Sequence, residues 1–125
     1  TDPRRGVQVD KSGDRAGMSR AKGNIAEDLA CDWLMRQGCR ILERNVYSRF
    51  GEIDIVAEKG GVLHFVEVKS GSTFEPIYNI TLSKLSKLSR SIDAYLKRHG
   101  LENPYQLDAL IVKGDRCEWI ENITV

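Results

Sequence analysis

Four charged residues in two neighbouring segments have the types and spacing for chemistry on a phosphate. Glu52 and Asp54 lie in the segment GEIDIVA, and Glu67 and Lys69 lie at the end of the segment FVEVK. Both segments are rich in β-branched or aromatic residues, and the two glycines at 60–61 suit a tight turn between them. The sequence therefore predicts a β-hairpin with a charged end.

The turn sets the register of this hairpin. With the two glycines as the loop, counting outward gives these opposite pairs: Lys59 and Val62, Val56 and Phe65, Asp54 and Glu67, Glu52 and Lys69. Side chains alternate along a strand, so we expect the last three pairs to share one face. Asp54 and Glu67 would then lie opposite each other, with β-carbons roughly 4.5 to 5.5 Å apart.

Two opposed carboxylates destabilise a sheet unless something compensates for their charge. A cation, a raised carboxyl pKa or a different register would each do so. Mg²⁺ is the most economical choice, because it binds one or two carboxylates together with water and substrate phosphates. Lys69 would then orient or deprotonate a metal-bound water, or hold charge in the transition state. The plainer interpretation, a hairpin with charges on a solvated face, does not explain the opposed acids.

At these residues the chain resembles the PD-(D/E)xK nucleases. Glu67-Val68-Lys69 matches the Glu-x-Lys of that motif and Asp54 its first acid, although Ile53 stands where the motif has proline. Within the superfamily, the chain is similar to the bacterial YraN-like family of predicted endonucleases and to the archaeal Holliday-junction resolvases. The resemblance implies hydrolysis of phosphodiester bonds in DNA, branched DNA included, with Mg²⁺ or Mn²⁺ at Asp54 and Glu67 and with Lys69 as a catalytic residue.

A helix is predicted over Ala21–Gln37, because apolar residues recur at helical spacing before Gly38. From spacing alone, Glu27 borders the apolar stripe, which includes Ile25, and is best interpreted as a solvated acid. The resemblance implies more. The family carries a helix of the form Lys-Gly-x-x-Ala-Glu, and here Lys22, Gly23, Ala26 and Glu27 match it in order. Glu27 would then be a third metal ligand and part of the catalytic set.

A second helix is predicted over Thr81–His99, with an apolar stripe that starts at Leu82 and with Gly100 as its stop. Lys84, Lys87 and Arg90 stand at steps of three and share one flank. That flank would contact the phosphates of a DNA backbone, and a solvated helix face would have the same pattern. The family resemblance favours DNA binding.

Further strands are predicted over Arg40–Val46, Gln106–Val112 and Cys117–Ile120, with a loop at Tyr47–Phe50. Asn45 is expected to hold the turn into that loop. Asp108 lies inside an apolar run, where we expect a Lys or Arg partner first and a site role second. His64 and His99 receive no role.

The predicted order is helix, three strands, helix, two strands. This is an α/β domain with a mixed β-sheet flanked by helices, because the second helix would connect parallel strands. The order resembles the restriction-endonuclease-like core.

Length and composition suit one small domain, with 125 residues, 41% apolar and 30% charged. The net charge of +1 is spread unevenly, with basic excess in 1–22 and in 84–98. Residues 1–17 are predicted to be a disordered arm or a remnant before a natural start at Met18, and 18–125 the single nuclease-like domain. With no membrane span or secretory signal in the sequence, we expect a cytoplasmic protein, and the three cysteines to be reduced thiols in its interior.

Two alternatives to a nuclease remain open on the sequence. One is a nucleic-acid binding module of the same fold that does not cut, and the other is a small interaction domain that forms a homodimer through an edge strand. One departure from the family also bears on function. Ser70-Gly71 follows Lys69, whereas the family commonly has a basic residue two positions beyond that lysine. The loop predicted at Ser72–Asn79 would flank the site.

Overall fold

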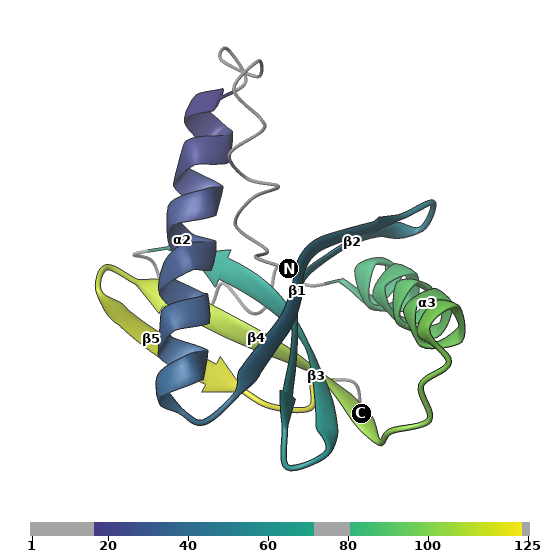
Figure 1. The fold of residues 1–125 in the computed structure, drawn as a ribbon. Coiled ribbons are helices and arrows are strands. Elements are labelled where there is room, and N and C mark those ends of the chain that lie inside the picture. Colours follow the sequence, from purple (N-terminus) through teal and green to yellow (C-terminus); the bar gives the residue numbers. More distant parts are fainter. Residues whose placement is uncertain (1–16, 72–80, 124–125) are drawn as a thin grey trace.

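A computed structural model of the chain describes residues 17–71 and 81–123. Its elements, in chain order, are α2 (Gly17–Arg36), β1 (Arg40–Ser48), β2 (Gly51–Lys59), β3 (Val62–Ser70), α3 (Leu82–His99), β4 (Tyr105–Lys113) and β5 (Arg116–Ile120) (Figure 1). The predicted order of elements is confirmed. The predicted arm, except for Gly17 at the start of α2, and the whole of the predicted loop at Ser72–Asn79 lie outside the described residues.

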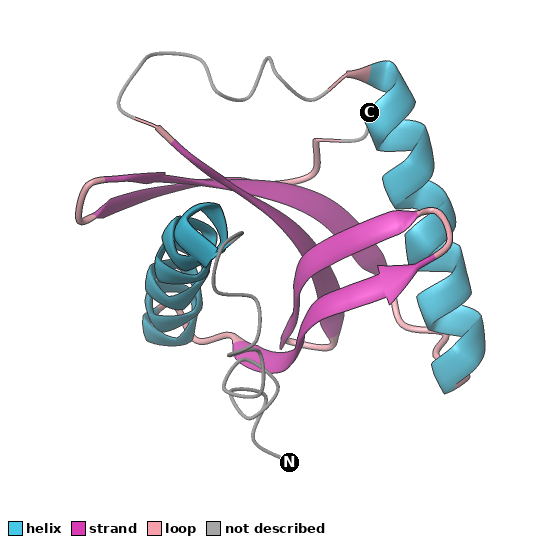
Figure 2. Ribbon diagram, turned by 90° about the horizontal axis from the view of Figure 1, so that it is seen from above, coloured by secondary structure: helices cyan, strands magenta, loops and turns pink. Residues whose placement is uncertain are grey.

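The five strands form one sheet in the order β1-β2-β3-β4-β5. Only β3 and β4 are parallel, and the other neighbours are antiparallel. This mixed sheet follows from the connections, because tight turns join antiparallel strands whereas α3 carries the chain from the end of β3 back to the start of β4. Figure 2 shows the sheet between the two helices.

Each helix covers its own apolar cluster. Against α2 the core contains Ala26, Ala30, Cys31 and Leu34 of the helix, with Ile55, Ala57, Val66, Leu110 and Val112 of the sheet. Against α3 it contains Leu88, Ile92 and Tyr95 of the helix, with Val46, Ile53, Val56, Leu63, Phe65 and Leu107 of the sheet. None of the described helices is both long and apolar enough to cross a membrane.

The predicted apolar stripes need two corrections at their N-terminal ends. The Ile25 side chain is 59% exposed, because Ala26, Ala30 and Leu34 form the row that faces the sheet and Ile25 is turned away from that row. Leu82 is 84% exposed, since it is the first residue of α3 and the stripe reaches the core only further along the helix. The ends of α3 are as predicted, with Thr81 accepting the backbone N–H of Lys84 and Gly100 left-handed at φ 61°.

The cysteines all have free thiols, as expected. Cys31 and Cys39 are buried, and burial raises the pKa of Cys31 to about 11. Cys117 is only partly buried, because it lies on the edge strand β5. The prediction that all three lie in the interior is therefore wrong for Cys117.

The hairpin register is confirmed from the turn outward, and the ladder between β2 and β3 runs from Lys59↔Val62 to Ile55↔Val66. It ends one pair before Asp54 and Glu67. From there β2 stays paired with β1, as far as Ser48↔Gly51. The strands thus separate where two carboxylates would otherwise face each other, which like-charge repulsion favours.

Side chains along β2 also stop alternating strictly between the two faces of the sheet at this point. This is contrary to the prediction that Glu52, Asp54 and Val56 share one face. Ile53 and Val56 both pack under α3, whereas Ile55 packs under α2. On β1, Asn45 has a positive φ of 53°, a conformation that asparagine tolerates better than most residues. Half of the predicted loop at 47–50 is strand, because β1 extends to Ser48 and only 49–50 form the turn, and Asn45 lies within β1 rather than at a turn. The irregular backbone at Asn45 in β1 accompanies the change of face in β2, and Asp54 lies where β2 changes face.

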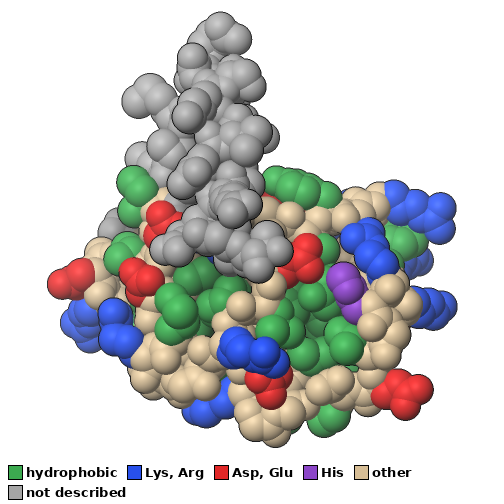
Figure 3. Space-filling model, in the orientation of Figure 1, with side chains coloured by type: hydrophobic (Ala, Val, Ile, Leu, Met, Phe, Trp, Pro, Cys, Tyr) green, Lys and Arg blue, Asp and Glu red, His purple; other side chains and the backbone are tan. Residues whose placement is uncertain are grey.

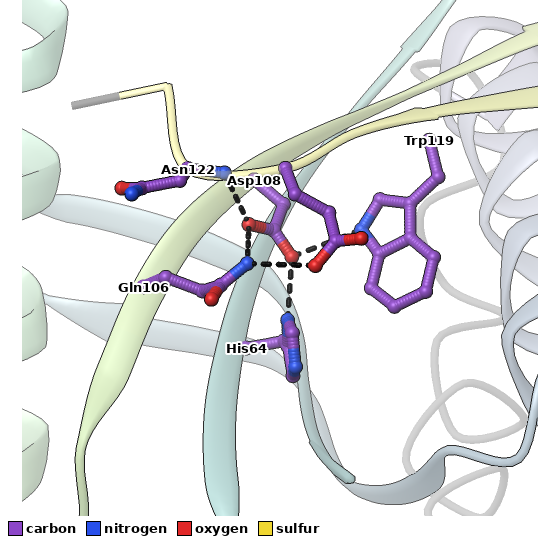
Figure 4. A network of polar contacts seen from close by, with 6 residues as sticks. His64, Gln106, Asp108, Trp119 and Asn122 are labelled. Atoms are coloured by element: carbon purple, nitrogen blue, oxygen red, sulfur yellow. Dashed lines mark hydrogen bonds and ion pairs between the residues drawn. The ribbon is translucent and has the colours of Figure 1, made fainter. Parts of the chain in front are cut away.

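A buried polar network surrounds Asp108 on β4 (Figure 4). The Asp108 side chain is fully buried, and both of its oxygens hold partners. Its four contacts are His64 Nδ1 at 2.7 Å, the Trp119 indole N–H at 2.9 Å, the Gln106 amide at 2.9 Å and the Asn122 backbone N–H at 2.8 Å. The predicted Lys or Arg partner is therefore wrong, because His64, Gln106, Trp119 and the Asn122 backbone satisfy this carboxylate. The network fixes the end of β5 to the sheet.

We expect Asp108→Asn to destabilise the fold by about 2 to 4 kcal/mol, because the new amide N–H₂ would face donors in place of an acceptor. The melting temperature should fall by roughly 10 °C. Glu121→Gln is the matched control, since exposed Glu121 contacts only the Gln106 amide in this network, at 3.0 Å. Equal melting temperatures for the two variants would contradict a structural role for Asp108.

Candidate metal centre

Charged side chains from four elements meet where β2 separates from β3. They are Glu27 of α2, Glu52 and Asp54 of β2, Glu67 and Lys69 of β3, and Lys84 of α3. The gap between the strands lets side chains from both helices approach the same point. Asp54 accordingly interacts with Glu67 on one side and with Glu27 on the other.

Asp54 is the most perturbed acid of this group. Its Oδ2 accepts the backbone N–H of Val68 at 2.8 Å, which anchors the side chain to β3 across the gap. Burial, and next the charge of Glu67, raise the pKa of Asp54 to about 8 against an ordinary 3.8, while the hydrogen bond from Val68 opposes the rise. Burial and the neighbouring acids therefore make ionisation of the Asp54 carboxyl energetically costly at neutral pH.

Glu67 is buried and is held by two lysines. Lys84 Nζ lies 2.9 Å from Glu67 Oε2, and Lys69 Nζ lies 3.7 Å from the same oxygen. The hydrogen bond to Glu67 raises the pKa of Lys84. Lys84 thus belongs to the carboxylate cluster, whereas Lys87 and Arg90 are exposed further along α3. The three basic residues that the sequence placed on one flank therefore have different surroundings.

Glu27 lies beside Asp54, and one of its oxygens accepts no hydrogen bond from the residues that the structure describes. Its Oε1 is buried and has no hydrogen-bond partner among the described residues. Arg44 Nη2 is 3.6 Å away, while Arg44 Nη1 binds Asp28 at 2.8 Å. Burial raises the pKa of Glu27, and the positive charge of Arg44 opposes that shift.

Arg44 was not singled out from the sequence. Its side chain is only 4% exposed, because it lies between β1 and α2. The local sequence around a single arginine in a predicted strand does not indicate that the arginine is buried. The burial of Arg44 is evident only from the packing of α2 on β1. Arg44 supplies a fixed positive charge beside Glu27 and so favours the ionised carboxylate that a metal would need.

The acids of the site fit a hard divalent cation. Ligand oxygens of Glu27, Glu52 and Asp54 all lie within 4.8 Å of one another, and Glu27 Oε1 is buried with no hydrogen-bond partner among those parts of the chain that are described. Carboxylate oxygens in this number are ligands of Mg²⁺ or Mn²⁺ rather than of softer metals. Glu52 was placed opposite Lys69 from the sequence, and the change of face in β2 brings it to the ligand group instead.

A second group, His64, Asp108 and Glu121, also has ligand atoms within 4.8 Å of one another. It differs chemically from the first, because each Asp108 oxygen already accepts two hydrogen bonds. A metal there would have to displace the Trp119 indole or the Asn122 backbone, neither of which can rearrange easily. The group is better interpreted as part of the fold.

Comparison with known proteins identifies the family. The sequence profile of the uncharacterised protein family UPF0102 matches residues 26–112, an interval that includes Glu27, Asp54, Glu67, Lys69 and Lys84. The chain belongs to the UPF0102 family. A UPF0102 protein of Helicobacter hepaticus is 58% identical over 107 residues, which cover 86% of this chain and 97% of the relative.

Two further UPF0102 proteins show the same extent of similarity. One from Wolinella succinogenes is 56% identical over 108 residues, covering 86% of this chain and all of the relative. One from Helicobacter pylori strain HPAG1 is 53% identical over 105 residues, covering 84% and 92%. UPF0102 is the YraN-like family, a predicted PD-(D/E)xK nuclease-like group, so the family resemblance found from the sequence is confirmed.

Proposed function

We propose that this protein is a metal-dependent nuclease that hydrolyses phosphodiester bonds in DNA. The observation that carries the proposal is the convergence of Asp54 and Glu67 with a buried oxygen of Glu27 that accepts no hydrogen bond from any described residue and has Arg44 only 3.6 Å away as an ion-pair partner, at the place where two strands separate. Buried acids crowded together lower stability, and a bound divalent cation would offset that cost. The sequence Glu67-Val68-Lys69 resembles the second half of the PD-(D/E)xK motif, and this resemblance supports a hydrolytic role.

Asp54, Glu67 and Glu27 would hold Mg²⁺ or Mn²⁺, with Glu52 as a fourth acid. The cation would supply a water of lowered pKa and neutralise charge on the phosphate that is attacked. Asp54 is already fixed by the Val68 N–H, which leaves its other oxygen for a ligand role. For Glu67 to become a ligand, Lys84 must give up part of its contact.

The two lysines would then have separate tasks. Lys69 lies on the same strand as Glu67 and contacts it only loosely, at 3.7 Å, so its side chain is placed to orient the attacking water as the ammonium ion, or to take a proton from that water as the neutral amine. Lys84 comes from the first turn of α3 and is partly exposed, so it can turn from Glu67 to a substrate phosphate. A cation from α3 would also compensate for Gly71, which stands where the family commonly has a basic residue.

The experiment that tests the proposal is single-turnover cleavage of a labelled linear duplex and a labelled branched DNA, in Mg²⁺ and in Mn²⁺. DNA binding is measured in Ca²⁺ on the same samples. We expect at least one of the two substrates to be cleaved, and we expect this cleavage to stop when the metal is chelated. A non-catalytic binding module would bind DNA and cut neither substrate, and an interaction domain would do neither.

The raised pKa of Asp54 predicts a pH-dependent stability. In metal-free protein the folded state keeps a proton on Asp54 up to about pH 8, whereas the unfolded chain releases it near 3.8. The contribution of this proton to stability is full below pH 3.8 and is lost as the pH rises towards 8. The melting temperature of the parent should therefore fall relative to Asp54→Asn across that range.

Mg²⁺ or Mn²⁺ should reverse this loss, because binding replaces the proton. The metal-induced rise in melting temperature should be larger at pH 8 than at pH 6 in the parent, and small at both in Asp54→Asn. Thermal melts in chelator and in saturating metal measure both effects. If the melting temperatures of the parent and of Asp54→Asn respond to pH and to metal in the same way, Asp54 does not belong to the metal site.

A further inference from the structure

The end of the β1–β2 hairpin lies beside α3 (Figure 1). Ser48 Oγ lies 3.0 Å from the Oγ of Ser91, a buried residue of α3. The backbone N–H of Phe50 donates to the same Ser48 Oγ at 3.1 Å, so the turn is ordered by its own side chain. Residues of the turn and of α3 therefore form one surface.

An aromatic ring in this surface orders two arginines. The guanidinium carbon of Arg49 lies 4.9 Å from the centroid of the Phe50 ring, and that of Arg90 lies 5.8 Å from it. Both arginines are exposed, and neither forms an ion pair with an acid in residues 17–71 or 81–123. A guanidinium held over a ring keeps its N–H edge directed outward at little entropic cost.

The surface is continuous with the candidate metal centre. Arg90 follows Lys84 by six residues on α3, which is about 9 Å along the helix axis, and exposed Lys87 lies between them. In Figure 3, Lys and Arg side chains gather on the right of the face shown, where Figure 1 places α3 and the hairpin. A strand of DNA rises about 3.4 Å per nucleotide, so about 9 Å corresponds to two or three nucleotides.

We propose that Arg49 and Arg90, ordered by Phe50, clamp one backbone phosphate of the DNA, two to three nucleotides from the phosphate that is cut. The inference rests on the proposed function and specifies the substrate contact. Planar guanidinium groups match phosphate oxygens in pairs, and the row from Lys84 to Arg90 leads directly to the acids that would hold the metal. An acidic protein could also bind these positive charges, but its binding would not require the basic row to be aligned with the metal centre.

The test is the salt dependence of DNA affinity, measured by fluorescence anisotropy of a labelled duplex in Ca²⁺. Arg49→Ala and Arg90→Ala should each lower the steepness of the log-affinity against log-salt plot by about one unit. Arg98→Ala is the matched control, because Arg98 is an exposed arginine on the last turn of the same helix. Its slope should stay close to that of the parent. Equal slopes for all three variants would overturn the clamp.

Phe50 gives a test in which charge does not change. Phe50→Leu should weaken DNA binding about two- to fivefold for each of the two cation–π contacts that it removes, while Phe50→Tyr keeps the ring and should bind like the parent. Melting temperatures confirm that both variants fold. Equal affinity of the Leu and Tyr variants would contradict the role of the ring.

Failure of this inference is distinguishable from failure of the proposed function. A parent protein that cuts DNA with metal, together with unchanged slopes in Arg49→Ala and Arg90→Ala, rejects the clamp and leaves the nuclease. A parent that neither cuts nor binds DNA rejects the nuclease and with it the clamp.

Discussion

Replacing Glu67 by glutamine is expected to lower metal-dependent DNA cleavage by roughly 10³-fold or more, the upper range for losing one charged group that stabilises a transition state. Glutamine has the shape of glutamate, so packing around this buried position should persist. It removes the negative charge that a cation needs and leaves Lys84 without its partner at 2.9 Å. Single-turnover rates in Mg²⁺, with metal affinity measured by calorimetry, give the result.

Glu118→Gln makes the same chemical change on exposed β5, where Glu118 contacts Lys113 at 3.4 Å. Its cleavage rate should equal that of the parent. A Glu67→Gln protein that cuts within a fewfold of the parent would show that Glu67 holds no essential metal.

Removal of the Lys69 ammonium should separate chemistry from binding. Lys69→Ala is expected to lower cleavage by roughly 10² to 10³-fold, the range for losing a positioned acid–base or transition-state group. Metal affinity and folding should change little, because Lys69 is a loose neighbour of Glu67 at 3.7 Å and is partly exposed. DNA affinity in Ca²⁺ should also stay near that of the parent.

Lys87→Ala is the control for Lys69. Lys87 is exposed on α3, so its loss should weaken DNA binding but leave unchanged the rate at which bound DNA is cut. If Lys69→Ala instead weakens binding and cuts bound DNA at the parental rate, Lys69 is a phosphate contact and the assigned role is wrong.

Local signals were sufficient to predict much of this fold. The two glycines at 60–61 set the register of β2 on β3, and the spacing of apolar residues together with Gly100 placed α3. The family resemblance placed Asp54, Glu67 and Glu27, and the structure brings all three to one region. Turn geometry and helix periodicity act over a few residues, so a single sequence carries them.

The rest of the site depends on contacts between distant segments. Glu52 joins the acids because β2 changes face opposite Asn45, and nothing within β2 indicates that change. Arg44 becomes a buried partner of α2 only through tertiary packing. Lys84 turns to Glu67 because α3 begins beside the separated strands, whereas its spacing along the helix predicted either a phosphate contact or a solvated face. Periodicity identifies the face of an element but not what that face contacts.

The metal centre is tested most directly by the anomalous diffraction of crystals soaked in Mn²⁺. We predict one peak at about 2.1 Å from carboxylate oxygens of Asp54 and Glu67, the ligand distance of a small divalent cation, with Glu27 in or next to its coordination shell. Crystals of Glu67→Gln should lose the peak under the same soak. No peak there at saturating Mn²⁺, or a peak confined to His64, Asp108 and Glu121, would contradict the assignment.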